Sequence, residues 1–517
     1  MSYNSYLCKY MKKYFSLFVI FFCLPFILWA VCDILPTFDD YTSLQSPWWV
    51  QIADPGYFFP DSVRRPFDAL LGAIVGWTPA LFPTLNHILI ILGHSLSACL
   101  VFTICQRLQL GTLASNIATL FFFFSPATLG ATLACDGFNQ TYAQLWGLIA
   151  LWLYLQYSIF PLVQRQLIFH FSLFTFPFSW LVCVVMAVLS KENGLAWAVV
   201  PPLVAYAFHL IDRSQAIRDI GKGLLVAVVY FAVFATLTLT GMLEYSNEYS
   251  EASFLSHVKD FVQLMAYTWL PIDYMSVVYP PTRNWAIVII TLLLSLPFLV
   301  MLLVGNAFQR DCQFIPDAGK RRLLSRTLPL LIVCFFILVL PHLLTVVSIM
   351  HNYAALSMAA LIIAYIVSTQ CPSTLESRSK LGLRLIFPFS LFMASALFTD
   401  VHHYIAARES GLIGRRLATQ VIEKTDKSVE RAMLISIDNP EEPRYSNFCV
   451  RPVDAFAWGL SVRHYSHYEW NIHIDEVTLP VYDPQQVNAM TASALHGDYD
   501  AVWVVGHNNG KLMIITE

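Results

Sequence analysis

The chain has 517 residues, of which 57% are hydrophobic and only 13% are charged, and its mean hydropathy is +0.59. A soluble protein of this length would carry about 25% charged residues, so the composition argues against a soluble enzyme and predicts a membrane protein. The formal net charge of −3 includes no basic block or aromatic-interleaved basic stripe, which argues against a nucleic-acid partner. The eleven cysteines show no zinc-ligand spacing, and a disulfide framework is not expected.

The N-terminus has the charge pattern of a signal peptide, with Lys9, Lys12 and Lys13 before the apolar run 14–31. The run is long enough to span a bilayer, and no small-x-small cleavage site follows it. We therefore expect a first helix that is retained.

Apolar stretches of about 18–24 residues recur as far as residue 400 and predict about eleven transmembrane helices. They are expected at 14–32, 84–106, 112–134, 141–160, 168–189, 194–211, 223–243, 284–306, 327–347, 350–369 and 384–400. Two further apolar stretches, 66–83 and 261–281, contain several prolines and are expected to lie at the membrane interface or dip into it.

The distribution of Lys and Arg predicts a cytoplasmic N-terminus, because basic residues favour the inner side of a membrane. With this orientation, sixteen basic residues before position 400 fall in inner segments and five in outer loops. The five are Arg64, Arg65, Lys191, Lys259 and Arg283. An odd number of helices then places the C-terminal segment outside the membrane, and the near absence of N-x-S/T sites favours a bacterial inner membrane.

Residues 401–517 differ from the apolar part and predict a small α/β domain on the outer face, after a transmembrane domain at 1–400. A helix is expected at 403–430 and a strand at 432–437. Two further strands, 501–505 and 511–516, flank Asn508-Asn509-Gly510, which favours a hairpin turn. Acceptor binding is one hypothesis for this domain.

Asp39 and Asp40 stand in the first outer loop, 33–83, directly after the first predicted helix. Charged groups so close to hydrocarbon tend to line cavities that hold water or substrate. A carboxylate there can act as a general base, alone or through a metal ion, and repulsion between the two favours a proton on one of them. The alternative is that acidic residues are simply common in outer loops.

Cationic side chains follow in two places. Lys191 and Glu192 separate two apolar stretches at the outer surface, where a lysine can offset charge on a leaving phosphate while the glutamate holds it or contacts an acceptor. Arg64 and Arg65 precede Pro66, and arginine forks suit phosphate oxygens. In both places the alternative is binding to lipid headgroups.

Several histidines are further candidates. His87 and His94 are seven residues apart and share a helix face, where a hydrogen-bonded structural role is the alternative to catalysis. His351 and Tyr353 could line the same cavity or mark the membrane interface. His402 and His403 are adjacent with no third metal ligand evident, so we expect a solvated corner there.

Taken in order, these motifs resemble those of the GT-C glycosyltransferase superfamily. They are Asp39-Asp40, Arg65-Pro66-Phe67, His87 with His94, and Leu189-Ser190-Lys191-Glu192-Asn193-Gly194. The resemblance covers roughly residues 10–210 and is closest to the membrane part of the transmembrane and tetratricopeptide-repeat O-mannosyltransferases. Protein O-mannosyltransferases and lipid A aminoarabinose transferases are more distant.

The sequence departs from the family pattern in four places. Phe67 stands where the family has leucine, and Ile91 stands where the family has asparagine between the two histidines. The late arginine-containing motif is only echoed at 351–357, where its arginine is missing. No tetratricopeptide repeats follow.

The resemblance implies a polyprenyl-phosphate-linked sugar donor and transfer to a hydroxyl acceptor, which is a glycan, lipid or protein, on the outer face. Asp39 or Asp40 would be the catalytic base, with Asp39 slightly favoured. The remaining roles are donor-phosphate binding for Arg64, Arg65 and Lys191, and support for Glu192, His87, His94, His351 and Tyr353. Metal dependence varies in the superfamily, so a divalent cation, on Asp39 and Asp40 if anywhere, is not decided by the sequence.

Two other classes of protein stay open. A transporter or flippase for a lipid-linked glycan would also place charges in a cavity, but it should show an internal repeat and charged or broken helices near the midplane, and neither is evident. A non-catalytic membrane scaffold is not excluded, because a fold does not guarantee chemistry.

Overall fold

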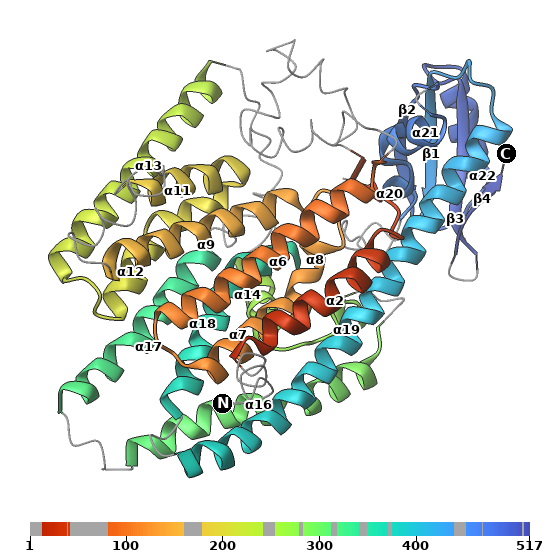
Figure 1. Ribbon diagram of the computed structural model, residues 1–517. Coiled ribbons are helices and arrows are strands. Elements are labelled where there is room, and N and C mark those ends of the chain that lie inside the picture. Colours follow the sequence, from red (N-terminus) through yellow and green to blue (C-terminus); the bar gives the residue numbers. More distant parts are fainter. Residues whose placement is uncertain are drawn as a thin grey trace.

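The computed structural model describes residues 13–38, 40–41, 81–159, 178–240, 254–278, 283–311, 318–340, 349–370, 375–438, 451–467, 469–508 and 511–516. Within these ranges the protein is mostly helical, with a small domain containing a sheet at one end (Figure 1). Asp39, Arg64 and Arg65 lie outside the described residues, as does nearly all of the proline-containing stretch 66–83.

The helical part is built from long helices joined by short 3₁₀ turns. Its α-helices are α2 (Phe15–Val31), α6 (Thr84–Arg107), α7 (Thr112–Phe123), α8 (Leu129–Thr132), α9 (Phe138–Ile159), α11 (Ser179–Ser190), α12 (Val200–Ala207), α13 (Arg213–Leu239), α14 (Phe254–Trp269), α15 (Tyr274–Val278), α16 (Trp285–Asp311), α17 (Ala318–Val339), α18 (Asn352–Gln370) and α19 (Leu375–Lys424). The 3₁₀ turns are η3 (Pro126–Thr128), η5 (Glu192–Ala198) and η8 (Ile349–His351).

Five helices in the described ranges are long and apolar enough to cross a membrane, namely α6, α13, α16, α18 and α19. A sixth span is formed if α7 and the following Pro126–Thr132 are taken together across their 46° bend. The bend falls where Ser125 caps the next turn and Pro126 supplies no N–H group, so α7 cannot continue. These long apolar helices indicate an integral membrane protein.

One predicted span is wrong as a single helix. Instead of a helix over 194–211, the chain forms η5 followed by the short α12. Pro201 and Pro202 stand in the first turn of α12, where missing N–H groups cost least. Gly194 lies so close to α11 that a Cβ there would be 2.3 Å from the Ala187 carbonyl oxygen, which tightens the turn after α11.

The helices differ in how much of their surface they bury. α18 is the most enclosed, and its residues Asn352–Val367 are all buried, in contact with a core drawn from α7, α9, α12 and α17. α13 is mostly exposed and carries large apolar side chains outward, including Leu225, Val228 and Phe231. An exposed apolar helix face of this kind is suited to contact with lipid.

The predicted helices at 384–400 and 403–430 are one continuous helix, α19, which leads into the C-terminal domain (Figure 1). The sheet there contains β1 (Arg431–Ile437), β2 (His473–Leu479), β3 (Ala501–Asn508) and β4 (Lys511–Thr516), in the order β2-β1-β3-β4. β1 is parallel to β2 and β3, and β3 pairs antiparallel with β4, which confirms the predicted first strand and the predicted hairpin. The short helices α20 (Pro452–Phe456) and α21 (Leu460–Tyr465), with α22 (Pro484–Leu495), complete this α/β domain.

Candidate functional site

Asp40 is buried, with 3% of its surface exposed, and its carboxylate binds the loop between α8 and α9. Oδ1 accepts hydrogen bonds from the backbone N–H groups of Cys135, at 2.5 Å, and Asp136, at 3.1 Å. Oδ2 accepts from the backbone N–H of Thr37, at 2.8 Å, and from its hydroxyl, at 3.4 Å. Both oxygens are therefore engaged inside the protein.

The sequence explains this conformation. Thr37 and Asp40 have the spacing of a capping box, in which the acidic side chain returns to the backbone N–H at the start of the turn. The Asp40 N–H completes the turn by donating to the Thr37 carbonyl oxygen at 2.8 Å. A carboxylate held by three backbone N–H groups is suited to anchoring two chain segments, and less suited to accepting a proton from a substrate.

Asn86 and His87, at the start of α6, reach the same loop. The Asn86 amide donates to the Cys135 carbonyl oxygen at 3.0 Å. The Nε2 of His87 lies 3.3 Å from the Ile34 carbonyl oxygen and 3.3 Å from the Cys135 sulfur. Since a carbonyl oxygen only accepts, Nε2 carries the proton of a neutral His87. His87 thus joins Ile34, which follows α2, to the loop that Asp40 binds.

Residues of the Lys191 motif bind the start of α9, which directly follows this loop. The Lys191 ammonium donates to the side-chain oxygen of Asn139 at 3.2 Å, and the Asn193 amide donates to that of Gln140 at 3.1 Å. We call residues 135–140 the 135–140 segment. It receives Asp40 at one end and Lys191 at the other, so the two motifs that are far apart in sequence converge on six consecutive residues.

The region around the 135–140 segment contains buried polar atoms that lack hydrogen-bond partners among the described residues. They include the Asn86 side-chain oxygen, the Gln140 side-chain nitrogen and both amide atoms of Gln144. Buried amides are normally satisfied, and inside a membrane protein such groups tend to face water or a substrate. Asn86 stands next to a candidate histidine in the sequence, whereas no local pattern marks the glutamines of α9.

His94 and Tyr353 form a separate pair deeper in the helical part. Nε2 of His94 lies 3.0 Å from the Phe123 carbonyl oxygen and donates to it, so Nδ1 accepts from the Tyr353 hydroxyl at 2.8 Å. The ring of His94 also stacks on Phe123, with centroids 5.0 Å apart. Both ring nitrogens are used to join α6, α7 and α18, which favours the structural interpretation of His94. His351 lies at the end of η8, directly before α18.

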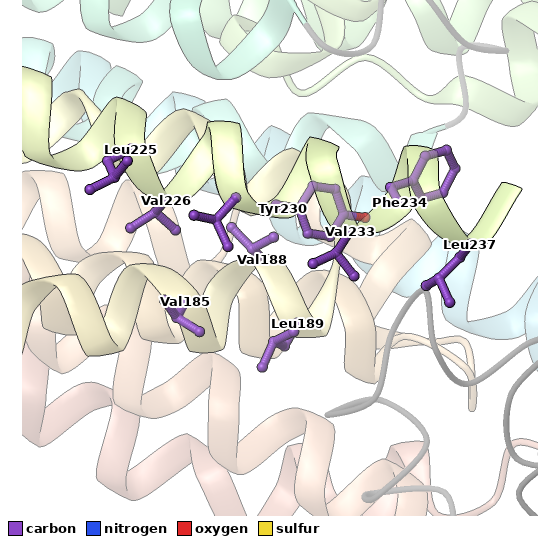
Figure 2. A pocket seen from close by; sticks show the side chains of 10 residues that line it. Val185, Val188, Leu189, Leu225, Val226, Tyr230, Val233, Phe234 and Leu237 are labelled. Atoms are coloured by element: carbon purple, nitrogen blue, oxygen red, sulfur yellow. The ribbon is translucent and has the colours of Figure 1, made fainter. Parts of the chain in front are cut away.

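An apolar groove with a volume of about 360 Å³ lies between α11 and α13 (Figure 2). Its walls are Val185, Val188, Leu189, Leu225, Val226, Val229, Tyr230, Val233, Phe234 and Leu237. Leu189 stands two residues before Lys191 in the sequence, whereas the Lys191 ammonium is bound to Asn139 of α9. From Leu225 to Leu237 the α13 wall is about 18 Å long, given a rise of about 1.5 Å per residue.

The C-terminal domain packs against the Asp40 turn. Tyr41 contacts Tyr465 of α21 through a hydrogen bond between their hydroxyl groups, at 3.3 Å. Phe38 lies against Trp458, with ring centroids 4.7 Å apart, and both residues have positive φ angles of 30° and 54°. Burial lowers the pKa of His464 to about 4, so a neutral imidazole ring packs on Tyr41 at neutral pH. Strained backbone of this kind is found where surrounding contacts fix it, and it clusters at functional sites.

The expectation of a solvated corner at His402 and His403 is wrong. His403 is fully buried, and Asp273, from the connection between α14 and α15, lies between the two histidines as a third candidate ligand. No local pattern could have identified this ligand, because Asp273 is 129 residues from His402.

No protein-family model matches the chain, and no curated protein matches it.

Proposed function

We propose that this protein is a GT-C-type glycosyltransferase, which moves a sugar from a polyprenyl-phosphate donor to a hydroxyl acceptor on the outer face of the membrane. The observation that carries the proposal is that Asp40 and Lys191, which are far apart in the sequence, both bind the 135–140 segment. The apolar groove between α11 and α13 supports a donor that carries a long apolar chain.

The donor would lie with its prenyl chain in the groove and its phosphate toward Lys191. α13 exposes most of its surface, so a lipid tail could enter sideways from the bilayer. The lysine ammonium would offset the charge that develops on the phosphate as the sugar leaves. Arg64 and Arg65 are proposed as further phosphate ligands, and Glu192 as support for Lys191.

Asp39 is proposed as the catalytic base, with Asp40 as the residue that positions it. The acceptor hydroxyl oxygen would attack the anomeric carbon as the bond from that carbon to the phosphate oxygen breaks. The hydroxyl proton would pass to Asp39, and polyprenyl phosphate would leave. The buried Asp40 carboxylate, bound to Cys135 and Asp136, supports a fixed position for the neighbouring residue.

The proposal includes the finer arrangement predicted from the sequence. The chain would have about eleven spans in a bacterial inner membrane, with a cytoplasmic N-terminus and the C-terminal domain outside. The contacts of Tyr465 and Trp458 with the Asp40 turn support a place for that domain beside the site.

The central experiment uses full-length protein in lipid nanodiscs with a panel of polyprenyl-phosphate sugars and a membrane extract as acceptor source. We expect release of polyprenyl phosphate for at least one donor, and a loss of at least 100-fold in Asp39→Asn and Lys191→Met. Lys427→Met is the matched control, because Lys427 is an exposed lysine that pairs with Glu469 in the C-terminal domain. Turnover that survives both site substitutions would contradict the proposal.

The groove is tested with two neighbouring valines of α13. Val229 lines the groove, whereas Val228 is 62% exposed and is not among the groove residues. Val229→Trp should raise the KM for long-chain donors about tenfold or more, and Val228→Trp should leave it unchanged. Binding of polyprenyl phosphate without turnover of any donor would instead favour a carrier or a scaffold.

A further inference from the structure

A cluster of three metal-ligand side chains lies where the connection between α14 and α15 meets α19. Asp273, His402 and His403 each offer an oxygen or nitrogen atom, and these atoms lie within 4.8 Å of one another. We propose that the cluster binds one divalent transition-metal ion of the Zn²⁺ class. The inference does not depend on the proposed function, because it rests on different residues.

The donor set decides the class of ion. Two imidazoles and one carboxylate suit Zn²⁺ and its neighbours in the first transition row, and three protein ligands leave a fourth position for water. Mg²⁺ and Ca²⁺ prefer oxygen ligands throughout, so this cluster should discriminate against them.

Hydrogen bonds from atoms that do not face the metal position orient the ligand side chains, beginning with His403. The Nδ1 of His403 lies 2.8 Å from the Thr399 carbonyl oxygen and donates to it, so the lone pair of a neutral His403 is on Nε2, 3.6 Å from Asp273 Oδ1. A backbone carbonyl that accepts from the second ring nitrogen is a common support for a metal-binding histidine.

Asp273 is oriented in the same way. Its carboxylate accepts from the Ser276 hydroxyl at 2.9 Å and from the Met275 N–H at 3.1 Å. The Thr399 hydroxyl donates to the Pro271 carbonyl oxygen at 3.1 Å, which ties α19 to the segment that carries Asp273. Both ligand-bearing segments are therefore held together independently of the ligands.

Two of the three ligand residues are buried, and the third is partly exposed to solvent. Asp273 and His403 are fully buried, and a buried carboxylate needs a compensating partner. The side chain of His402 is 33% exposed, and its Nδ1 lies 2.5 Å from Asp273 Oδ2. A tetrahedral ion with bonds of about 2.0–2.1 Å needs ligand atoms about 3.3 Å apart, so the partly exposed His402 would swing outward and the ion would replace the shared proton.

The ion would link the connection between α14 and α15 to α19, close to the segment that follows α2. Met275, two residues after Asp273, packs in one apolar cluster with Ile34 and with Ala407 of α19. Ile34 in turn provides the carbonyl oxygen that contacts His87. A metal at this place would therefore stabilise the segment that leads into the Asp40 turn.

The experiment uses the purified full-length protein, treated with EDTA and dialysed, with Zn²⁺ as the probe. Isothermal titration should give one equivalent of Zn²⁺ bound with a Kd on the order of 10 µM or tighter, elemental analysis should recover the same stoichiometry, and Tm should rise with Zn²⁺ concentration. His402→Ala and His403→Gln should each weaken binding at least tenfold. Mg²⁺ should neither bind nor compete.

His473→Ala is the matched control. His473 also pairs with an aspartate, Asp475, at 3.1 Å, but the pair is exposed on β2 and is not part of a three-ligand cluster among the described residues. Its substitution should leave the Zn²⁺ affinity unchanged. Because His402 is partly exposed, His402→Ala should fold even if a buried variant does not. Absence of stoichiometric Zn²⁺ binding, or binding that His402→Ala leaves intact, would overturn the inference.

Discussion

The hydroxyl oxygens of Tyr41 and Tyr465 lie 3.3 Å apart across 424 residues of sequence, with Tyr41 as the donor. Tyr41 directly follows Asp40, and Tyr465 ends α21 of the C-terminal domain. Tyr41 belongs to an apolar cluster with Phe82, Phe138 and Ala457, so the contact is enclosed by packed side chains. The C-terminal domain is therefore part of the structure that fixes the Asp40 turn.

The hydrogen bond between the two tyrosines should be measurable as a coupling energy. Tyr41→Phe and Tyr465→Phe should each destabilise the protein by about 1 kcal/mol, and the double variant by less than the sum, because either single change already breaks the bond. Chemical unfolding of the solubilised protein gives the three values. Tyr482→Phe, at an exposed tyrosine of the same domain, should change stability little. Additive effects of the two site variants would show that the hydroxyl contact contributes nothing.

Asp40→Asn should lower stability. An amide in place of the carboxylate points an NH₂ group at a backbone N–H of Cys135 or Thr37, which leaves a buried donor without a partner and costs about 1–3 kcal/mol. Asp39→Asn should retain the wild-type Tm and lose turnover. Thermal unfolding and donor hydrolysis, measured on the same preparations, separate the two carboxylates. A stable, inactive Asp40→Asn protein would instead assign the chemistry to Asp40.

Gly147 of α9 makes room for Trp197 of η5. A Cβ at Gly147 would lie 2.1 Å from the Trp197 ring, so Gly147→Ala must displace η5 and should destabilise the protein by about 1–3 kcal/mol. Because Lys191 immediately precedes η5, donor affinity should fall as well. Unfolding and donor-binding measurements check both effects.

Gly221 is the matched control for that substitution. It is inside α13, and a Cβ added there would meet no described atom within 4 Å. Gly221→Ala should therefore leave donor binding unchanged and raise helix stability by about 0.5–1 kcal/mol. Equal losses of stability and donor binding in both variants would mean that the close contact with Trp197 does not cause the effect of Gly147→Ala.

Glu476 of β2 makes the C-terminal domain sensitive to pH. Desolvation raises the pKa of its carboxyl from 4.5 to about 7, although the charge of Arg451 opposes the shift. The folded state therefore prefers the protonated form. Its contribution to stability is complete below pH 4.5 and is lost as the pH rises through about 7.

Glu476→Gln should remove this dependence. Between about pH 5 and pH 8 the wild-type domain should lose roughly 1–2 kcal/mol more than the variant, after allowance for solvent screening. Hydrogen exchange of the β1 and β2 amides, corrected for intrinsic rates, reports the difference locally. Identical pH profiles for the two proteins would rule out Glu476 as the cause.

Local patterns in the sequence are enough to predict several elements. The apolar stretch 84–106 becomes α6, and the turn signal around Asn508 marks the hairpin of β3 and β4, because length and turn chemistry act over short distances. The sequence does not predict β2, since His473–Leu479 mixes charged with apolar residues and its place in the sheet depends on pairing with β1. The continuity of α19 through residue 400 was not predicted either, because polarity changes there while helix propensity does not.

The candidate site was predictable only in its separate parts. Motif order indicated that Asp40 and Lys191 belong together, but not that both bind the 135–140 segment. The spacing of Thr37 and Asp40 fits a capped turn, but it does not show that Asp40 also binds Cys135 and Asp136, so its anchoring role needed the structure. Asp273 could not be assigned to His402 and His403 either, because tertiary packing alone brings them together.

α19 runs along the helical part and continues into the C-terminal domain (Figure 1). Its 50 residues extend about 75 Å, which is well over twice the thickness of a bilayer core. Leu417 and Val421, near the C-terminal end of α19, form part of the core of the C-terminal domain, so a movement of that domain must displace this end of the helix. A displacement of the C-terminal domain should therefore be carried along α19 into the helical part.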